Sequence, residues 1–217
     1  INLIANNGIV VSSDIINTNK LEGFNDTVVV DTLYRSIPNE KKARYKVKIE
    51  TGDGYTKEEY GGYYLANRED CEPFLAGCFY EDRDPFAVSI TGNDQIIIQK
   101  KSWVYYRVNS IKAQKYATIK KASVFVNGEE ILLSLEGESG EGFGGSVDSC
   151  TDTEAFFTVE DSRGFVTQES VKIKICPWKS PTAIIVAERT TTPQQVKIKV
   201  TADYSPVLGQ NTVTIKL

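Results

Sequence analysis

The stretch from residue 156 to residue 181 reads F-F-T-V-E-D-S-R-G-F-V-T-Q-E-S-V-K-I-K-I-C-P-W-K-S-P. Phe157 and Val159 alternate with polar neighbours, which is the period of a half-buried β-strand. The Asp, Ser and Gly in residues 161–164 are typical of a tight turn, because Asp and Ser bond to nearby backbone and Gly accepts positive φ. Residues 165–175 alternate again, so the whole stretch predicts a β-hairpin.

The segment after this hairpin ends the predicted sheet, because proline has no N–H to donate to a strand ladder. A cysteine, a proline and an aromatic residue occur there in Cys176-Pro177-Trp178, and a similar order occurs in Cys71-Glu72-Pro73-Phe74. The two cysteines are 105 positions apart (176 − 71), about the length of one sandwich domain. We therefore expect three tandem parts, at residues 1–70, 71–178 and 179–217.

Further strand patterns fall inside these parts. Apolar residues alternate with charged ones over residues 45–50, just before a Gly-Asp-Gly turn at residues 52–54. Asn127-Gly128 between two apolar runs is a strong signal of a two-residue hairpin turn. The sequence predicts an all-β chain of tandem Ig-like or fibronectin III-like β-sandwich domains, of which residues 71–178 are the complete one.

The two outer parts are expected to be incomplete. The chain starts at Ile1 and contains no Met, which indicates a piece of a longer protein. The third part has strand-like runs at residues 184–187, 196–200 and 212–217, and three strands cannot close a sandwich. Its bare edge is expected to pair with the continuation of the chain or with a strand from a partner.

The composition weakens several classes of function. The chain of 217 residues has a formal charge of −4 and a pI near 5.1, whereas proteins that bind nucleic-acid backbones are usually basic. It contains no His, which removes Ser-His-Asp and Cys-His nucleophile systems and His-ligated metals. No apolar run is long enough to span a membrane. We therefore expect no enzyme, no cofactor, no nucleic-acid partner and no insertion into a membrane.

Four cysteines, at positions 71, 78, 150 and 176, leave three alternatives. Free, partly buried thiols are favoured, because four cysteines in a chain of this length are far fewer than a disulfide scaffold contains. A disulfide remains an alternative because the count is even. A zinc site is the least favoured, because without His it would need all four cysteines from distant positions.

One aromatic cluster could bind a ligand. Trp103 and Tyr105, together with Tyr106, could form a platform for a sugar, because an aromatic face suits a ligand with one apolar side. Alternating aromatic residues on a strand are more often core residues or cross-strand partners. Packing is therefore the favoured interpretation, and a ligand site the alternative.

The segment from residue 136 to residue 149 is rich in Gly and acidic residues and is predicted to be a surface loop. Its side chains of Glu138, Glu141 and Asp148 are candidate Ca²⁺ ligands, although no known loop spacing is matched and such loops are usually only solvated. Residues 140–145 also match G-x-G-x-x-G. No helix pattern follows them, so nucleotide binding is not expected.

Several of these segments resemble the Ig-like repeat modules of minor structural proteins from the tails of long-tailed phages that infect Gram-positive bacteria. In that family a T-G-D/N segment opens the module, a (T/V)-x-D-S-R-G hairpin closes it and a Y-x-x-P exit follows. The matching segments here are residues 89–94 with Thr91-Gly92-Asn93, residues 157–164, and residues 177–181, in which Trp178 stands where the family usually has Tyr. Residues 33–50 are similar to the F-Y-x-x-I-P-N-A-K segment of a preceding module, and residues 196–217 to the start of a following one.

The resemblance implies a structural, non-enzymatic component of a phage tail or baseplate. Its partners would be other tail or baseplate proteins, further copies of the chain and the glycans of a host cell wall, and its location would be the virion. The family offers no catalytic or ligand-binding residues, and its D-S-R-G turn is expected to satisfy backbone groups and a neighbouring strand. The alternatives are an adhesin-type Ig-like array on a bacterial surface and a carbohydrate-binding accessory module.

Overall fold

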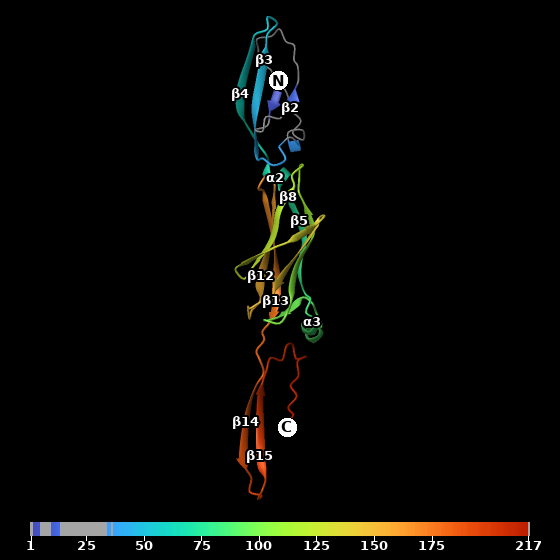
Figure 1. The fold of residues 1–217 in the computed structure, drawn as a ribbon, viewed down its shortest axis with the longest axis vertical. Helices are drawn as coiled ribbons and strands as arrows, with labels where there is room; N and C mark the ends of the chain where they lie inside the picture. Colours follow the sequence, from blue (N-terminus) through green and yellow to red (C-terminus); the bar gives the residue numbers. More distant parts are fainter. Residues whose placement is uncertain (1, 5–9, 14–33, 36, 217) are drawn as a thin grey trace.

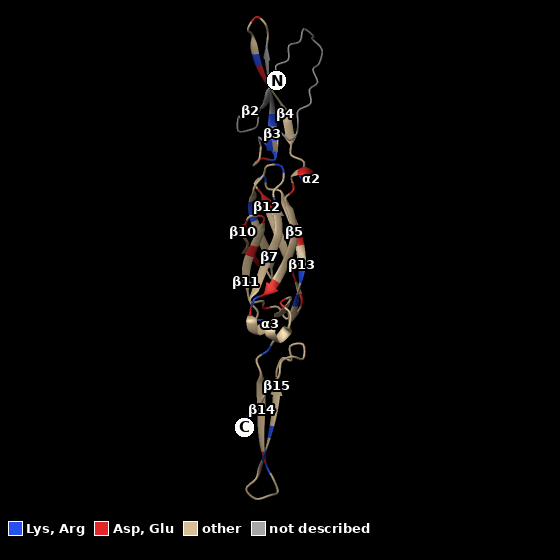
Figure 2. Ribbon diagram, turned by 90° about the vertical axis from the view of Figure 1, so that its right-hand side faces the viewer, with Lys and Arg blue, Asp and Glu red and all other residues tan. Residues whose placement is uncertain are grey.

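The computed structural model describes residues 2–4, 10–13, 34–35 and 37–216 (Figure 1). Most of the regular structure is β-strand, so the predicted all-β class is confirmed. Three parts follow one another along the long axis of an elongated molecule (Figure 1). Acidic and basic residues occur in all three parts (Figure 2). Residues 14–33 of the predicted first part lie outside the described residues.

The first part contains one antiparallel sheet with the strand order β2-β1-β3-β4. Its strands are β1 (Asn2–Ile4), β2 (Val10–Ser13), β3 (Lys42–Glu50) and β4 (Thr56–Leu65). The predicted hairpin around the Gly-Asp-Gly turn is confirmed, since β3 pairs with β4 and the backbone N–H of Thr51 donates to the carbonyl of Tyr55 at 2.9 Å. A short helix, α2 (Arg68–Cys71), leads from this sheet into the second part.

The second part is a sandwich of two sheets around one apolar core. Sheet 1 has the order β10-β11-β7-β5, and sheet 2 has the order β6-β13-β12-β8-β9. The strands of sheet 1 are β10 (Ser134–Glu136), β11 (Ser139–Gly145), β7 (Val104–Lys112) and β5 (Phe74–Asp82). Those of sheet 2 are β6 (Ile96–Ile98), β13 (Val166–Cys176), β12 (Thr153–Asp161), β8 (Ile119–Val126) and β9 (Glu129–Leu132).

The core of the sandwich comes from strand alternation. On β7, Val104, Tyr106 and Val108 are buried, and on β12 the buried side chains include Phe157 and Val159. The ring of Tyr106 meets that of Phe157 edge-on with centroids 6.2 Å apart, an arrangement that aromatic pairs favour. Because side chains alternate along a strand, the inward-facing residues of both sheets form the core, and the residues between them face outward.

Both predicted hairpins of the sandwich are confirmed. Between β12 and β13, the side-chain Oδ1 of Asp161 accepts hydrogen bonds from the backbone N–H groups of Arg163 (2.9 Å) and Phe165 (2.8 Å). Between β8 and β9, Asn127 and Gly128 have φ values of 50° and 86°, and a type I′ turn requires positive φ at both positions.

The prediction of a loop over residues 136–149 is wrong, because β11 lies inside it and pairs with both β10 and β7. The residues of β11 that face inward are glycines. A Cβ on Gly144 would lie 2.4 Å from Cε2 of Tyr106, and one on Gly142 would lie 2.9 Å from Cδ2 of Leu133. The strand approaches the core too closely for side chains, so it lacks the apolar alternation by which strands are predicted.

Helix α3 (Pro85–Thr91), which was not expected from the sequence, closes one end of the sandwich (Figure 1). The carboxylate of Asp84 accepts from the N–H of Ala87 at 2.7 Å, proline occupies the first turn, and Gly92 ends the helix at φ 67°. These are ordinary start and stop signals, although the helix between them is only seven residues long.

The third part is a two-stranded ribbon of β14 (Thr182–Arg189) and β15 (Val196–Asp203), as predicted for those two runs. The strand predicted over residues 212–217 is not formed in its described residues, 212–216. The backbone N–H of Asn211 donates to the carbonyl of Pro206 at 3.0 Å, which closes a turn, and the chain then runs on without a ladder partner. Alternation alone does not form a strand, because the backbone also needs a partner to pair with.

Candidate functional site

The three aromatic residues proposed as a platform do not share one face. Tyr106 is a core residue, which corrects the grouping made from the sequence. Trp103 and Tyr105 lie on the outer face of sheet 1, where the Trp103 side chain is 52% exposed. Because side chains alternate along a strand, Trp103, Tyr105 and Arg107 point to the same side.

Neighbouring strands add further residues to this side, which we call the outer face. The register pairs Phe79 and Glu81 of β5 with Arg107 and Tyr105 of β7, and it pairs Tyr105 with Phe143 of β11. The outer face consists of four aromatic and four charged residues: Phe79, Glu81, Arg83, Trp103, Tyr105, Arg107, Glu141 and Phe143.

Ion pairs connect the charged residues of the outer face. The guanidinium of Arg83 donates to both carboxylate oxygens of Glu141, at 2.8 and 2.5 Å, and to Glu81 at 2.5 Å. The guanidinium of Arg107 lies 3.2 Å from Glu141 and 3.8 Å from Glu81. Hydrogen bonds from Arg83 lower the pKa of Glu141, and the same bonds raise the pKa of Arg83. The four groups form a closed network of two positive and two negative charges.

Aromatic rings lie against this network. The guanidinium carbon of Arg83 is 4.1 Å from the centre of the Tyr105 ring, and that of Arg107 is 5.4 Å from the centre of the Phe79 ring. The rings of Tyr105 and Phe143 have centroids 4.9 Å apart. Phe143 is nevertheless 56% exposed. The outer face therefore combines fixed planar polar groups with apolar surface that water reaches.

The candidate Ca²⁺ ligands are not brought together. Glu141 belongs to the ion-pair network, and Glu138 pairs with Lys112 at 2.9 Å on an adjacent strand. Asp148 lines a small cavity of about 170 Å³ beside Glu129, and its backbone carbonyl accepts from the side-chain amide of Gln99. Within the described ranges, no three His, Cys, Asp or Glu side chains are grouped so as to hold a metal ion.

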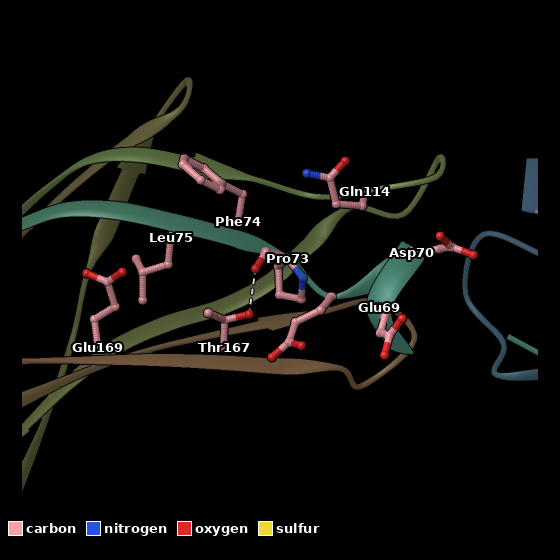
Figure 3. Close-up of a pocket in the computed structure, with 9 residues that line it drawn as sticks. Glu69, Asp70, Pro73, Phe74, Leu75, Gln114, Thr167 and Glu169 are labelled. Atoms are coloured by element: carbon pink, nitrogen blue, oxygen red, sulfur yellow. Dashed lines mark hydrogen bonds between the residues drawn. The ribbon is translucent and has the colours of Figure 1, made fainter. Parts of the chain in front are cut away.

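A larger open hollow, of about 550 Å³, lies at the end of the sandwich nearest the first part (Figure 3). Glu69 and Asp70 border it on α2, Glu169 borders it on β13, and the hydroxyl of Thr167 donates to the carbonyl of Pro73 at 2.5 Å on its wall. Its lining is acidic. A group of carboxylates by itself identifies no ligand, so we assign it no role.

All four cysteines are unpaired in the structure, in agreement with the favoured prediction. Cys71 is buried, Cys78 and Cys176 are partly buried, and Cys150 is exposed. Burial raises the pKa of Cys78 to about 12. A thiol with a raised pKa is mostly protonated at neutral pH, and the thiol is a weaker nucleophile than the thiolate.

Arg163 of the D-S-R-G turn joins the sandwich to the first part. Its guanidinium is buried and donates to four backbone carbonyls, those of Tyr34 (3.1 Å), Ile37 (3.1 Å), Gln114 (3.1 Å) and Lys115. The first two belong to the segment before β3, and the last two belong to the loop between β7 and β8. The expectation that this turn satisfies backbone groups is confirmed.

Other contacts extend the same junction, which we call the first junction. Within the turn, the hydroxyl of Ser162 donates to the carbonyl of Pro38 at 2.8 Å, and the ammonium of Lys41 donates to the carbonyl of Gly164 at 2.8 Å. A small apolar cluster also spans the boundary, with Tyr34 and Tyr64 on one side and Phe165 on the other, and it includes Cys71. The first junction is therefore a buried, hydrogen-bonded contact.

The second junction, between the sandwich and the ribbon, depends mainly on apolar packing. Val207, which follows β15, packs in a buried cluster with Ala87 of α3 and Ile98 of β6, and Cys176 and Trp178 border this cluster. The backbone N–H of Lys179 also donates to the hydroxyl of Ser205 at 2.7 Å. The two Cys-Pro-aromatic segments that marked predicted boundaries thus lie at the two junctions.

Comparisons with protein-family models, with curated proteins and with solved structures found no match to this chain. Among the described residues, no helix has the length and apolar character that crossing a membrane would need.

Proposed function

We propose that this chain is a structural segment of a phage tail or baseplate, in which Ig-like domains are joined end to end for display. The strand order of the sandwich supports the Ig-like part of the proposal. Sheet 1 corresponds to the order A-B-E-D when read from β5 to β10, and β8, β12 and β13 correspond to C-F-G. In this assignment β9 extends the second sheet as C′, and β6 adds a parallel strand beside β13.

The first junction is the observation that carries the proposal. The D-S-R-G turn, one of the motifs on which the family resemblance rests, is also the turn whose arginine bonds to the preceding part. A motif of this kind has a physical reason to recur in tandem arrays, because each copy fixes its domain to the one before it. The proposal therefore links the resemblance to a contact that an isolated domain does not need.

On this proposal the chain has no catalytic role and needs no cofactor. Its partners are other tail or baseplate proteins and further copies of itself, and it is located on the virion. Display of several copies raises the effective concentration of weak contacts at a host surface, so each domain can bind weakly while the assembly binds firmly.

Immunogold electron microscopy tests the proposal, with an antibody raised against this chain and phage particles from the source culture. Gold on the tail is the expected result, and its position along the tail separates the shaft from the baseplate. Gold on the bacterial envelope with unlabelled virions would overturn the proposal in favour of the adhesin-type array.

A further inference from the structure

The outer face of sheet 1 has a feature that the fold does not require. Trp103 and Phe143 are 52% and 56% exposed, although the burial of apolar surface favours folding. Phe143 lies on one side of the sheet together with Tyr105 and Phe79, and Trp103 directly precedes β7, two positions before Tyr105. Exposed aromatic residues gathered on one face mark a binding surface more often than single exposed ones do.

The charged residues of the outer face limit the charge that a ligand can carry. Arg83 and Arg107 are each paired with Glu81 and Glu141, so the face carries two positive and two negative charges. A phosphorylated or sulfated polymer would be repelled by the two carboxylates, and a polycation would be repelled by the two guanidinium groups. A neutral ligand is repelled by neither, and it can still bond to the remaining N–H donors and oxygen lone pairs of these groups.

The shape of the outer face also favours an extended ligand. Its residues lie across three adjacent strands of a sheet, and neither of the two hollows described above lies among them. The ion pairs and the Arg83–Tyr105 stacking hold the polar groups in place, which lowers the entropy that binding would cost. A surface that spans three strands and holds its polar groups in place can contact several units of a chain molecule.

We propose that the outer face binds a neutral polysaccharide. Sugar rings present an apolar C–H face that can stack on the exposed rings of Trp103 and Phe143, and they present hydroxyl groups that can bond to guanidinium and carboxylate groups. This inference rests on the proposed function for its biological setting, since display at a host surface supplies the ligand. The binding itself is a property of the isolated chain and can be measured without the virion.

Affinity gel electrophoresis of the purified chain tests the inference. The gels contain dextran, mannan, galactan or the neutral wall polysaccharide extracted from bacteria of the source culture. Dextran sulfate and polylysine serve as charged comparisons. We expect at least one neutral polysaccharide to retard the native protein, and we expect Trp103→Ala to weaken that retardation at least tenfold.

A matched control comes from the other sheet. Phe125 of β8 is 48% exposed on the outer side of sheet 2. Phe125→Ala therefore removes a similar area of exposed ring from the sheet that does not carry the proposed site. It should leave retardation unchanged. Phe143→Ser provides a second variant of the outer face in case Trp103→Ala does not fold, which a thermal melt would show.

Four results would overturn the inference. These are no retardation by any neutral polysaccharide, retardation by a charged polymer alone, an equal loss in Phe125→Ala, and self-association that Trp103→Ala abolishes. The last would show that the outer face contacts a second copy of the chain. Gold on virions without retardation refutes only the polysaccharide inference, and retardation with gold on the bacterial envelope refutes only the tail assignment.

Discussion

Arg163 is only 5% exposed, and the carbonyls that accept from it belong to two segments that no strand ladder joins. Hydrogen bonds to a charged group each contribute about 1.5–3 kcal/mol, and the carbonyls left behind would be buried without donors. We therefore expect Arg163→Ala to lower the free energy of unfolding by about 3 kcal/mol. Urea denaturation followed by tryptophan fluorescence measures this change.

Two variants sharpen this prediction. Arg163→Lys keeps the charge but replaces a planar fork of five donors with a single ammonium, so we expect it to recover less than half of the loss. Arg68→Ala removes an exposed arginine that pairs with Glu72 at 3.1 Å, and it should cost no more than about 0.5 kcal/mol. Arg163→Lys with wild-type stability would show that charge rather than the donor fork holds the first junction.

Gly144 lies where a side chain has no room. Its Cβ would lie 2.4 Å from Cε2 of Tyr106, so Gly144→Ala should displace β11 or the core ring and destabilise the sandwich by about 2 kcal/mol. A lower melting temperature in a thermal scan would report this. Gly52→Ala, with no heavy atom within 4 Å of the new Cβ, should melt close to wild type, and equal melting of both variants would contradict the predicted contact.

The pKa of Glu141 is lowered by hydrogen bonds from Arg83, and this makes a pH prediction possible. Since the folded pKa lies below the unfolded value of about 4.3, the pair stabilises the fold above that pH, and the stabilisation is lost as pH falls through the folded pKa. The effect should be small because both side chains are more than one third exposed. Carboxyl NMR titration should place Glu141 below the ordinary Glu range and show its pKa rising in Arg83→Gln.

The ribbon of β14 and β15 is the element with the least support. Its apolar side chains include Ile185, Val196 and Ile198, and each is more than half exposed. A two-stranded hairpin is marginally stable by itself in water, and elements with few buried contacts open at low free energy. Hydrogen exchange followed by mass spectrometry should therefore show β14 and β15 exchanging well before β7 and β12. Equal protection would show that something in solution covers the ribbon.

The elements that could be predicted from the sequence are those whose local signals agree with their environment. The hairpin of β12 and β13 has alternation on both arms and a turn with Asp and Gly, so local reasoning finds it. Strand β11 was missed because glycines occupy its inward positions. Helix α3 was missed although Asp84, Pro85 and Gly92 supply its caps, since seven residues are too few to show a helical period.

The candidate site was predictable in part for a related reason. Trp103, Tyr105 and Arg107 follow one another at every second position, so one strand of the outer face can be found from alternation alone. Glu81 and Glu141 could not be placed beside them, because the register of β5 and β11 against β7 depends on long-range pairing. Cross-strand neighbours are set by tertiary structure, which sequence spacing does not encode.

At the scale of the whole molecule, the two junctions determine whether the three parts move together. The first junction combines buried hydrogen bonds with an apolar cluster, and the second depends mainly on the cluster around Val207. Interfaces between domains of one chain are often small and permit relative motion. A buried contact at each boundary restricts this motion and would therefore keep such an array extended. The function proposed here needs that extension, because a display segment must hold its domains away from the particle.

The last prediction concerns the second junction. Val207 is 2% exposed among Ala87 and Ile98, so Val207→Asp would place an unpaired charge in an apolar cluster, which costs several kcal/mol. The response that costs the least free energy is detachment of the ribbon, because in the described part of the chain β14 and β15 form a sheet of their own and pair with no strand of the sandwich. Small-angle X-ray scattering should then show a broader range of particle shapes, while the thermal transition of the sandwich stays within a few degrees of wild type. Val213→Asp changes an exposed valine of the same part and should leave the scattering unchanged. Identical scattering from Val207→Asp and wild type would show that the cluster does not hold the ribbon in line, and the extended array would then need another cause.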